Sequence, residues 1–149
     1  LGDMATLNLI PMVLDRLSRG ETPKIFGTDY PTPDGTCIRD YIHVRDLATA
    51  HIAALDHLAG GRDMAEHVFN VGTGKGSSVR EVVSKVIAAT GLDVEPEELD
   101  RRAGDPPQLI GDAQRIGAVL GWRAEHDLDD IVTSSFSSWQ ADPARRRIG

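Results

Sequence analysis

The sequence predicts an α/β fold, and three observations support that prediction. Apolar residues recur at helical spacing in several separate segments. Short runs rich in β-forming residues lie between these segments and are bounded by glycine or proline. The two kinds of segment alternate along the chain, as they do in α/β proteins. With 149 residues and 40% hydrophobic content, the chain is long enough for one domain with its own core.

The first predicted helix begins after Asn8, whose side chain suits an N-cap, and ends at Gly20. Its apolar face comprises Leu9, Ile10, Val13, Leu14 and Leu17. A short strand is predicted over residues 24–26, followed by a loop over residues 28–36 that contains two prolines and an Asp-Gly pair. Residues 38–44 alternate in character from one position to the next, which predicts an extended segment with polar groups on one face.

A second helix is predicted from about Asp46 to Ala59, where a pair of glycines ends it. Its core-facing residues are expected to be Leu47, Ala50, Ala54, Leu55 and Leu58. Residues 67–71 have the pattern of a buried strand. A third helix starts at a capping box made by Ser78 and Glu81, and Gly91 closes it.

The last third of the chain predicts two more helices, over residues 113–120 and 128–139. Ile131, Val132 and Phe136 are expected to face inward. A further short strand is predicted near Val94.

The acidic composition excludes a nucleic-acid-binding function. The net charge is -7 and the pI is about 5.1, with carboxylates along the whole length and no basic stripe to contact phosphates. No segment approaches the roughly 20 apolar residues needed to cross a bilayer. Cys37 is the single cysteine, which excludes an internal disulfide and suits a reducing compartment such as the cytoplasm. We expect it to pack as a small hydrophobic residue.

No catalytic, cofactor-binding or metal-binding motif is recognised in the chain. The Gly-rich turn over residues 72–77 follows a predicted strand, but Ser77 replaces the third glycine of a dinucleotide-binding fingerprint. We therefore interpret it as a turn that leads into a capped helix. The histidines lack metal-ligand spacing, and His51 and His57 are expected to be structural. His43 shares a face with Arg39 and could belong either to a polar network or to a site.

Two arginines and one aspartate are candidates for a ligand-binding site. Arg39 and Arg102, brought together by folding, would suit a diphosphate because each guanidinium offers paired donors. Asp105 could accept hydrogen bonds from ribose hydroxyls. Spacing alone leaves open the alternative that these residues form ordinary surface salt bridges.

Longer motifs favour the ligand site. The segment from Ile25 to Ala48, with Pro-x-Pro-Asp-Gly-Thr followed by Arg-Asp-Tyr-Ile-His-Val, closely resembles the corresponding stretch of UDP-glucose 4-epimerases, members of the extended short-chain dehydrogenase/reductase superfamily. Residues 69–74 and 101–106 are similar to two further motifs of that family, in the same order. The resemblance covers the chain from about Asn8 to Pro143.

The resemblance implies a role for each matching residue. Asn8 corresponds to an asparagine that contacts the substrate diphosphate, and Lys24, Ile25 and Phe26 correspond to the segment that holds the uracil. Arg39 and Arg102 correspond to the arginines that bind the diphosphate, and Asp105 to the aspartate that holds the uridine ribose. Leu109 corresponds to a position whose bulk limits the C2 substituent of the sugar, and leucine is small enough to leave N-acetylated sugars open.

The resemblance also implies the reaction, the cofactor and the partners. Such enzymes interconvert UDP-glucose and UDP-galactose in galactose metabolism. NAD takes hydride from C4 of the hexose, a tyrosine takes the hydroxyl proton, and hydride returns to the other face of the rotated 4-keto sugar. These epimerases often form homodimers. No metal, nucleic acid or membrane is expected to take part.

We interpret residues 1–149 as a single C-terminal substrate-binding portion, with the NAD-binding Rossmann domain and the catalytic tyrosine and lysine upstream of it. The start at Leu1, with a helical pattern close behind, favours a fragment that is inactive alone. Two alternatives stay open. One is another nucleotide-sugar enzyme of the superfamily, such as a UDP-sugar decarboxylase or dehydratase, and the other is a truncated, non-catalytic binding module.

Overall fold

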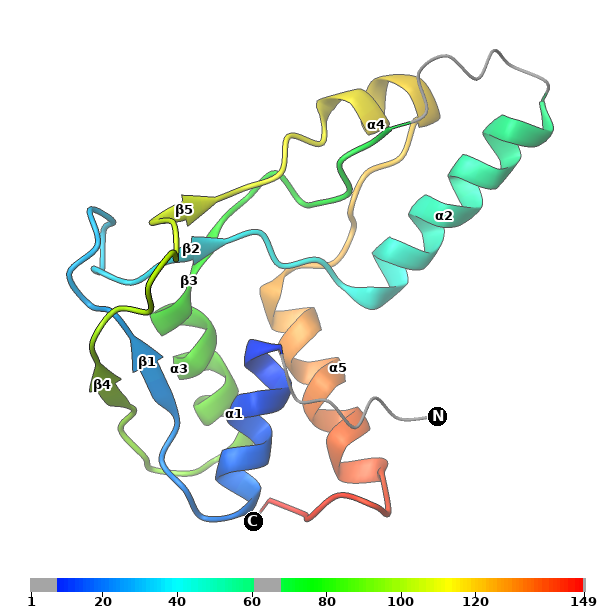
Figure 1. The fold of residues 1–149 in the computed structure, drawn as a ribbon. Coiled ribbons are helices and arrows are strands. Elements are labelled where there is room, and N and C mark those ends of the chain that lie inside the picture. The colour runs from blue at the N-terminus through cyan, green and yellow to red at the C-terminus, as the bar shows by residue number, and fades with distance from the viewer. Residues whose placement is uncertain (1–7, 61–67, 149) are drawn as a thin grey trace.

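A computed structural model describes residues 8–60 and 68–148, with the elements arranged as in Figure 1. In chain order they are α1 (Leu9–Ser18), β1 (Lys24–Phe26), β2 (Ile38–Arg39), α2 (Val44–Ala59), β3 (Ser77–Ser78), α3 (Val79–Thr90), β4 (Glu97–Leu99), β5 (Gln108–Leu109), α4 (Gln114–Leu120) and α5 (Leu128–Ala141). Helices and short strands alternate, which confirms the predicted α/β class.

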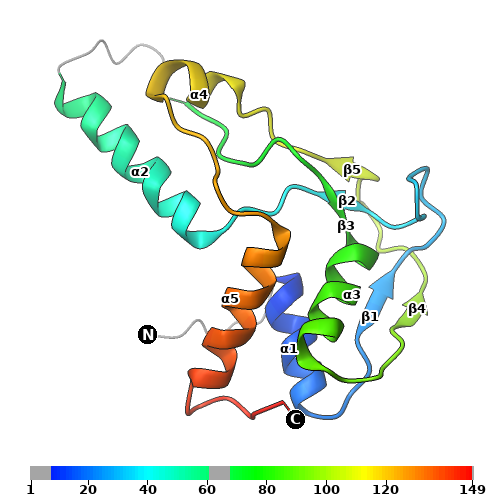
Figure 2. The same ribbon diagram turned by 180° about the vertical axis from the view of Figure 1, so that it is seen from behind.

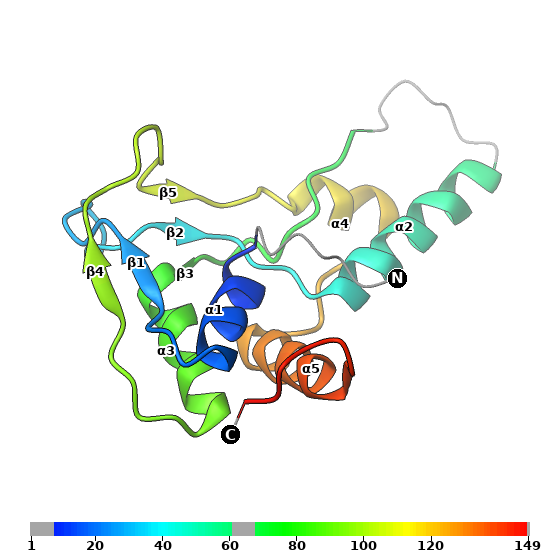
Figure 3. The same ribbon diagram turned by 60° about the horizontal axis from the view of Figure 1, so that its bottom comes forward.

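Helices α1, α3 and α5 pack together over strand β1 and enclose most of the buried apolar surface (Figures 1 and 3). We call this buried set the main core: Ile10, Val13, Leu14, Leu17, Ile25, Val82, Val83, Val86, Ile87, Ile131, Val132, Trp139 and Ile148. Its members on α1 and α5 agree with the predicted apolar faces. Burial of each large aliphatic side chain contributes about 1.5–3 kcal/mol, so the main core stabilises this half of the molecule.

The predicted helix ends are confirmed for most of the main-core helices. The Ser78 hydroxyl accepts from the Glu81 backbone N–H at the start of α3, and Gly91 ends that helix in the left-handed conformation, at φ 72°. Asn8 precedes α1 with extended backbone, but its side chain makes no capping hydrogen bond. That side chain is therefore not needed to start the helix.

Two small sheets connect the helices. Strand β1 pairs in parallel with β4, whereas β2 lies between β3, to which it is antiparallel, and β5, to which it is parallel. Strand β4 begins at Glu97, so the strand predicted near Val94 forms three residues later. Strands β3 and β5 have two residues each and no apolar alternation, and the sequence did not predict them.

The region around α2 and α4 lies apart from the main core (Figure 2). A second, smaller buried cluster holds these two helices together through Ala50, Ile116 and Trp122. The Trp122 indole N–H also donates to the Thr49 hydroxyl, at 2.9 Å. This outer cluster has few members, so it covers only a small part of the α2 surface.

Three predictions for this region are wrong. The extended segment ends after Arg39, and α2 begins at Val44 rather than Asp46, because the His43 ring accepts the Arg45 backbone N–H and caps the helix. Leu47, Leu55 and Leu58 do not face a core: they are 37%, 64% and 41% exposed. None of these leucines belongs to a buried cluster of the described residues or to the partly buried set that packs against one.

The strand predicted over residues 67–71 does not form in its described part, residues 68–71. Phe69 and Val71 instead pack their side chains against the outer cluster, and Val68 is 80% exposed. The Asn70 side chain donates to the Asp112 carbonyl, at 3.3 Å. Apolar periodicity thus predicted burial at two positions, but no described strand pairs with this backbone.

No helix in the two described ranges is long and apolar enough to cross a membrane.

Candidate functional site

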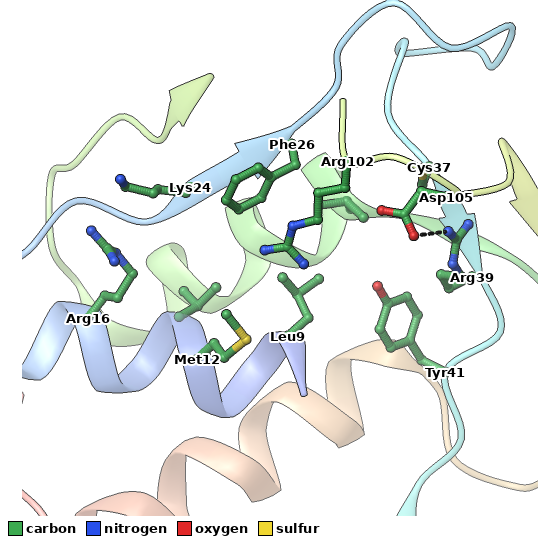
Figure 4. Close-up of a pocket in the computed structure, with 12 residues that line it drawn as sticks. Leu9, Met12, Arg16, Lys24, Phe26, Cys37, Arg39, Tyr41, Arg102 and Asp105 are labelled. Carbon is green, nitrogen blue, oxygen red and sulfur yellow. Dashed lines mark hydrogen bonds and ion pairs between the residues drawn. The ribbon is translucent and has the colours of Figure 1, made fainter. Parts of the chain in front are cut away.

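A cavity of about 280 Å³ opens between helix α1, strand β1, the end of β2 and the loop over residues 101–106 (Figure 4). Lys24 and Phe26 enter it from β1, and Arg39 enters it from β2. Arg102 and Asp105 enter it from the loop. Folding therefore brings the two arginines, which are 63 positions apart in the sequence, to one cavity beside Asp105.

Arg39 is held in place by backbone carbonyls. Its Nη1 donates to the Ile38 carbonyl at 2.9 Å and to the Pro106 carbonyl at 2.8 Å. Its Nη2 lies 3.4 Å from Asp105 Oδ1, and the two side chains are 23% and 40% exposed. A half-exposed pair of this length contributes at most about 1 kcal/mol, so an anionic ligand can replace Asp105 as a partner of Arg39.

Arg102 lies with its guanidinium 3.8 Å from the centre of the Phe26 ring. The turn that carries it closes when the Asp105 N–H donates to the Arg102 carbonyl at 3.4 Å, with Gly104 at φ 87°. The preceding residue, Arg101, turns away: its Nε pairs with the Asp29 carboxylate and its guanidinium lies 4.2 Å from the centre of the Tyr30 ring. Adjacent arginines therefore have different surroundings, and only Arg102 lines the cavity.

The cavity has the charge of an anion-binding site. Its basic residues are Arg16, Lys24, Arg39 and Arg102, and Asp105 is its one acidic residue among those described. The whole chain has a net charge of -7, so the positive lining is a local feature. A concave surface with one sign of charge concentrates ligands of the opposite sign.

The remaining wall is largely apolar. Leu9, Met12 and Val13 of α1 form one side, and Tyr41 closes the end beside Arg39, with its hydroxyl directed into the cavity (Figure 4). Burial raises the pKa of Tyr41 to about 12, although Arg39 acts in the opposite direction. The phenol is therefore protonated near neutral pH and can donate a hydrogen bond.

Five of the predicted site residues line the cavity and three do not. Asn8 is exposed just before the lining residue Leu9. Ile25 is 0% exposed and belongs to the main core, because its side chain points to the opposite face of β1 from Lys24 and Phe26. Leu109 is 63% exposed on β5 and lies outside the cavity lining.

The contribution of α1 to the cavity was not predicted from the sequence. Leu9, Met12, Val13 and Arg16 follow the i, i+3, i+4, i+7 spacing of one helix face. That spacing could have identified a second face beside the buried one, with Arg16 as its only charged member. Tyr41 and Cys37 were missed as lining residues as well; Cys37 is buried, as predicted for a small hydrophobic residue.

The Gly-rich turn over residues 72–77 does not fit a dinucleotide. The Asp40 carboxylate accepts from the Thr73 N–H at 2.9 Å and from the Gly74 N–H at 3.1 Å, and it also accepts from the Gly111 N–H at 3.3 Å. These turn amides are bound to a negative charge within the protein, where a dinucleotide site would offer them to phosphate. The structure supports the prediction of a turn that leads into a capped helix.

His43 belongs to a buried polar network rather than to the cavity. Its Nε2 lies 2.9 Å from the Ser134 hydroxyl, and its ring stacks on His126 with 4.4 Å between centroids. His126 in turn pairs with the buried Asp46 at 2.8 Å. Burial acts to raise the pKa of Asp46, but hydrogen bonds from the His126 ring and from the backbone N–H groups of His126 and Glu125 lower it overall. In the part of the chain that the structure describes, no group of acidic, histidine or cysteine side chains has the arrangement of a metal site.

Known proteins resemble the chain along most of its length. Residues 3–72 match the family model Epimerase, the NAD dependent epimerase/dehydratase family. The UDP-glucose 4-epimerase of Azospirillum brasilense is 52% identical over 83% of this chain, and that of Corynebacterium glutamicum is 44% identical over 87%. The chain spans 35% and 39% of the length of these two relatives.

Solved structures agree with these relatives. A crystal structure of a UDP-glucose 4-epimerase superposes with a TM-score of 0.86 at 39% identity, over 93% of this chain and 42% of that one. The Bifidobacterium longum UDP-glucose 4-epimerase in complex with NAD⁺ and UDP gives a TM-score of 0.78 at 41% identity, over 92% of this chain and 40% of that one. The fold is therefore that of part of an extended short-chain dehydrogenase/reductase. By sequence and by structure, the chain is similar to part of the UDP-glucose 4-epimerases, and residues 3–72 match the model of the NAD dependent epimerase/dehydratase family.

Proposed function

We propose that this chain supplies the UDP-sugar-binding part of a UDP-glucose 4-epimerase that interconverts UDP-glucose and UDP-galactose in galactose metabolism. One observation carries the proposal: Arg39 and Arg102 line the same cavity, with Asp105 between them. The chemistry of a nucleotide sugar matches this arrangement, because a diphosphate needs several converging donors and a ribose offers hydroxyl groups to a carboxylate.

The diphosphate occupies the space between the two guanidinium groups. Arg39 is already oriented by the Ile38 and Pro106 carbonyls, so little side-chain entropy is lost when it binds phosphate oxygens. Asp105 then exchanges part of its contact with Arg39 for the ribose hydroxyls. With the UDP held at both phosphates, the sugar can turn without leaving the protein, which inversion at C4 requires.

The chemistry at C4 belongs to another part of the protein. NAD, when bound, would supply the hydride acceptor and donor for C4, and the Gly-rich turn over residues 72–77 directs its amides to Asp40 instead of a phosphate. We propose that NAD and the catalytic residues are held by a separate domain outside residues 1–149, that this chain alone is inactive, and that the full-length protein forms a homodimer. The single cysteine, Cys37, is consistent with a cytoplasmic location.

The test is the product that the full-length protein makes from UDP-galactose. We expect UDP-glucose, formed by inversion at C4 without loss of carbon or water. Loss of C6 would indicate a decarboxylase, and elimination of water a dehydratase. Binding of UDP-galactose without turnover, in protein loaded with NAD, would support a non-catalytic binding module.

A further inference from the structure

The extended segment over residues 39–41 carries two lining residues of the cavity and, between them, one residue that does not line it. Arg39 and Tyr41 both line the cavity, with the Tyr41 hydroxyl directed into it (Figure 4). Asp40 is absent from the lining, because successive side chains of an extended segment point to opposite sides. Strand β2 ends at Arg39, and residues 40–43 have no regular secondary structure. The pairing of β2 therefore does not by itself hold Tyr41 in place.

The Asp40 carboxylate anchors this segment to two other parts of the chain. Its Oδ1 accepts from the Thr73 N–H at 2.9 Å and from the Thr73 hydroxyl at 2.6 Å. Its Oδ2 accepts from the Gly74 N–H at 3.1 Å and from the Gly111 N–H at 3.3 Å. The Asp40 backbone N–H also donates to the Leu109 carbonyl, at 3.2 Å. Both the side chain and the backbone of Asp40 are therefore fixed, directly between the two lining residues.

The Gly-rich turn over residues 72–77 is shaped around this carboxylate. A Cβ atom at Gly72 would lie 2.5 Å from Asp40 Oδ2, so any side chain at that position would displace the carboxylate. Successive backbone N–H groups of such a turn form a concave site for an anion. Here the anion is Asp40 of the same chain. The turn is thus a binding site for the Asp40 side chain, a role that the proposed function does not by itself explain.

We propose that Asp40 is the positioning residue of the diphosphate site. It does not touch the ligand, and it acts through Arg39 and Tyr41, whose donors it holds at a fixed separation in the cavity. Donors that are already in place lose little conformational entropy when they bind phosphate oxygens, so the anchor increases affinity for the diphosphate and not for the nucleoside. This inference rests on the proposed function.

The experiment compares UDP with uridine on the full-length protein. The Kd of UDP is measured by isothermal titration calorimetry and that of uridine by competition against UDP, at a temperature where circular dichroism shows each variant folded. In Asp40→Asn, an amide NH2 group faces N–H donors that the carboxylate accepts, so the segment loses its anchor. We expect the affinity for UDP to fall about tenfold or more, and that for uridine to stay within about twofold of the wild type.

The matched control is a variant that is destabilised elsewhere. Val132 of α5 is 3% exposed in the main core, and none of the described α5 residues lines the cavity. Val132→Ala should lower the urea midpoint, as Asp40→Asn should, because it leaves a space in the core. The segment over residues 39–41 keeps its anchor in this variant, so the ratio of UDP to uridine affinity should equal that of the wild type.

Should Asp40→Asn not fold, two changes to its partner decide the question. Thr73→Val removes the hydroxyl that donates to Asp40 at 2.6 Å, and we expect it to lower the ratio of UDP to uridine affinity about threefold. Thr73→Ser restores a hydroxyl and should restore the ratio. Equal ratios in these two variants would overturn the inference.

Two results with folded Asp40→Asn would overturn the inference and leave the proposed function intact. One is a ratio of UDP to uridine affinity equal to that of the wild type, including the case in which both ligands bind more weakly by the same factor. The other is an equal loss of UDP affinity in Val132→Ala, because the effect would then follow from lower stability. A wild-type protein that binds UDP no more tightly than uridine would instead overturn the proposed function itself.

Discussion

Replacement of Arg102 by alanine is the most direct test of the diphosphate site. Arg102 lies on an exposed loop and contacts the Phe26 ring at 3.8 Å. An exposed cation–π contact contributes about 0.5–1 kcal/mol, so the variant should fold with little loss of stability. Its charge-assisted hydrogen bonds to a phosphate are worth more, about 1.5–3 kcal/mol. We therefore expect the Kd for UDP to rise about 10- to 150-fold.

The assay is calorimetric titration of the full-length protein with UDP, and the chain offers a matched control. Arg101→Ala removes the same side chain from the adjacent position, but Arg101 pairs with Asp29 and Tyr30 outside the cavity. We expect the control to bind UDP within about twofold of the wild type, a difference of about 0.4 kcal/mol. Arg102→Lys should recover only part of the affinity, because an ammonium group lacks the paired donors of a guanidinium. If Arg102→Ala and Arg101→Ala bind UDP equally well, Arg102 does not contact the phosphates.

Three further predictions concern stability. Tyr41 has a folded-state pKa of about 12, above its ordinary value, so its contribution to stability is complete below pH 10 and is lost as the pH rises toward 12. In urea titrations, the unfolding free energy should therefore fall less over that pH range for Tyr41→Phe than for the wild type. Equal falls in the two proteins would contradict the burial of the phenol. Asp40→Asn should lower the unfolding free energy by about 1–3 kcal/mol, since Asp40 accepts from Thr73, Gly74 and Gly111, and an unchanged urea midpoint would count against this role. The 149-residue chain alone should bind a hydrophobic dye and melt over a broad temperature range, because Ile52 and Leu55 of α2 are 57% and 64% exposed. The double variant Ile52→Gln, Leu55→Gln should bind less dye. A sharp melt without dye binding by the unmodified chain would refute this prediction.

Helix α2 shows what apolar periodicity predicts and what it does not. The apolar spacing of Leu47, Leu55 and Leu58 correctly predicted a helix, but it did not identify a partner surface. In the structure these side chains remain 37–64% exposed. Amphipathic spacing indicates that one face of a helix is suited to burial. Whether that face is buried depends on another element that packs against it. The α1 pattern succeeded on both counts because α3 and α5 cover its apolar face.

The strands around the cavity show the opposite case. Residues 77–78 and 108–109 have no β-forming pattern, yet both pair with β2 and hold Arg39 in register. Two-residue strands depend on hydrogen bonds between backbone segments that are distant in the sequence. The local pattern of side chains does not predict those hydrogen bonds. Arg16 was not predicted as a lining residue for a related reason. The spacing along α1 predicts which residues share a helix face, but it does not predict that β1 lies opposite that face.

The sequence by itself determined the α/β class, the ends of α1, α3 and α4, and the identity of Arg39, Arg102 and Asp105 as candidates. These features depend on local spacing, on capping residues and on motifs, all of which are contained in short segments. Only the tertiary structure decided that the two arginines line one cavity, that Arg101 turns to Asp29 instead, and that Arg16 of α1 lines the same cavity. Those outcomes depend on contacts between residues far apart in the chain, and such contacts are set by the packing of α1, β1 and the 101–106 loop rather than by any one segment.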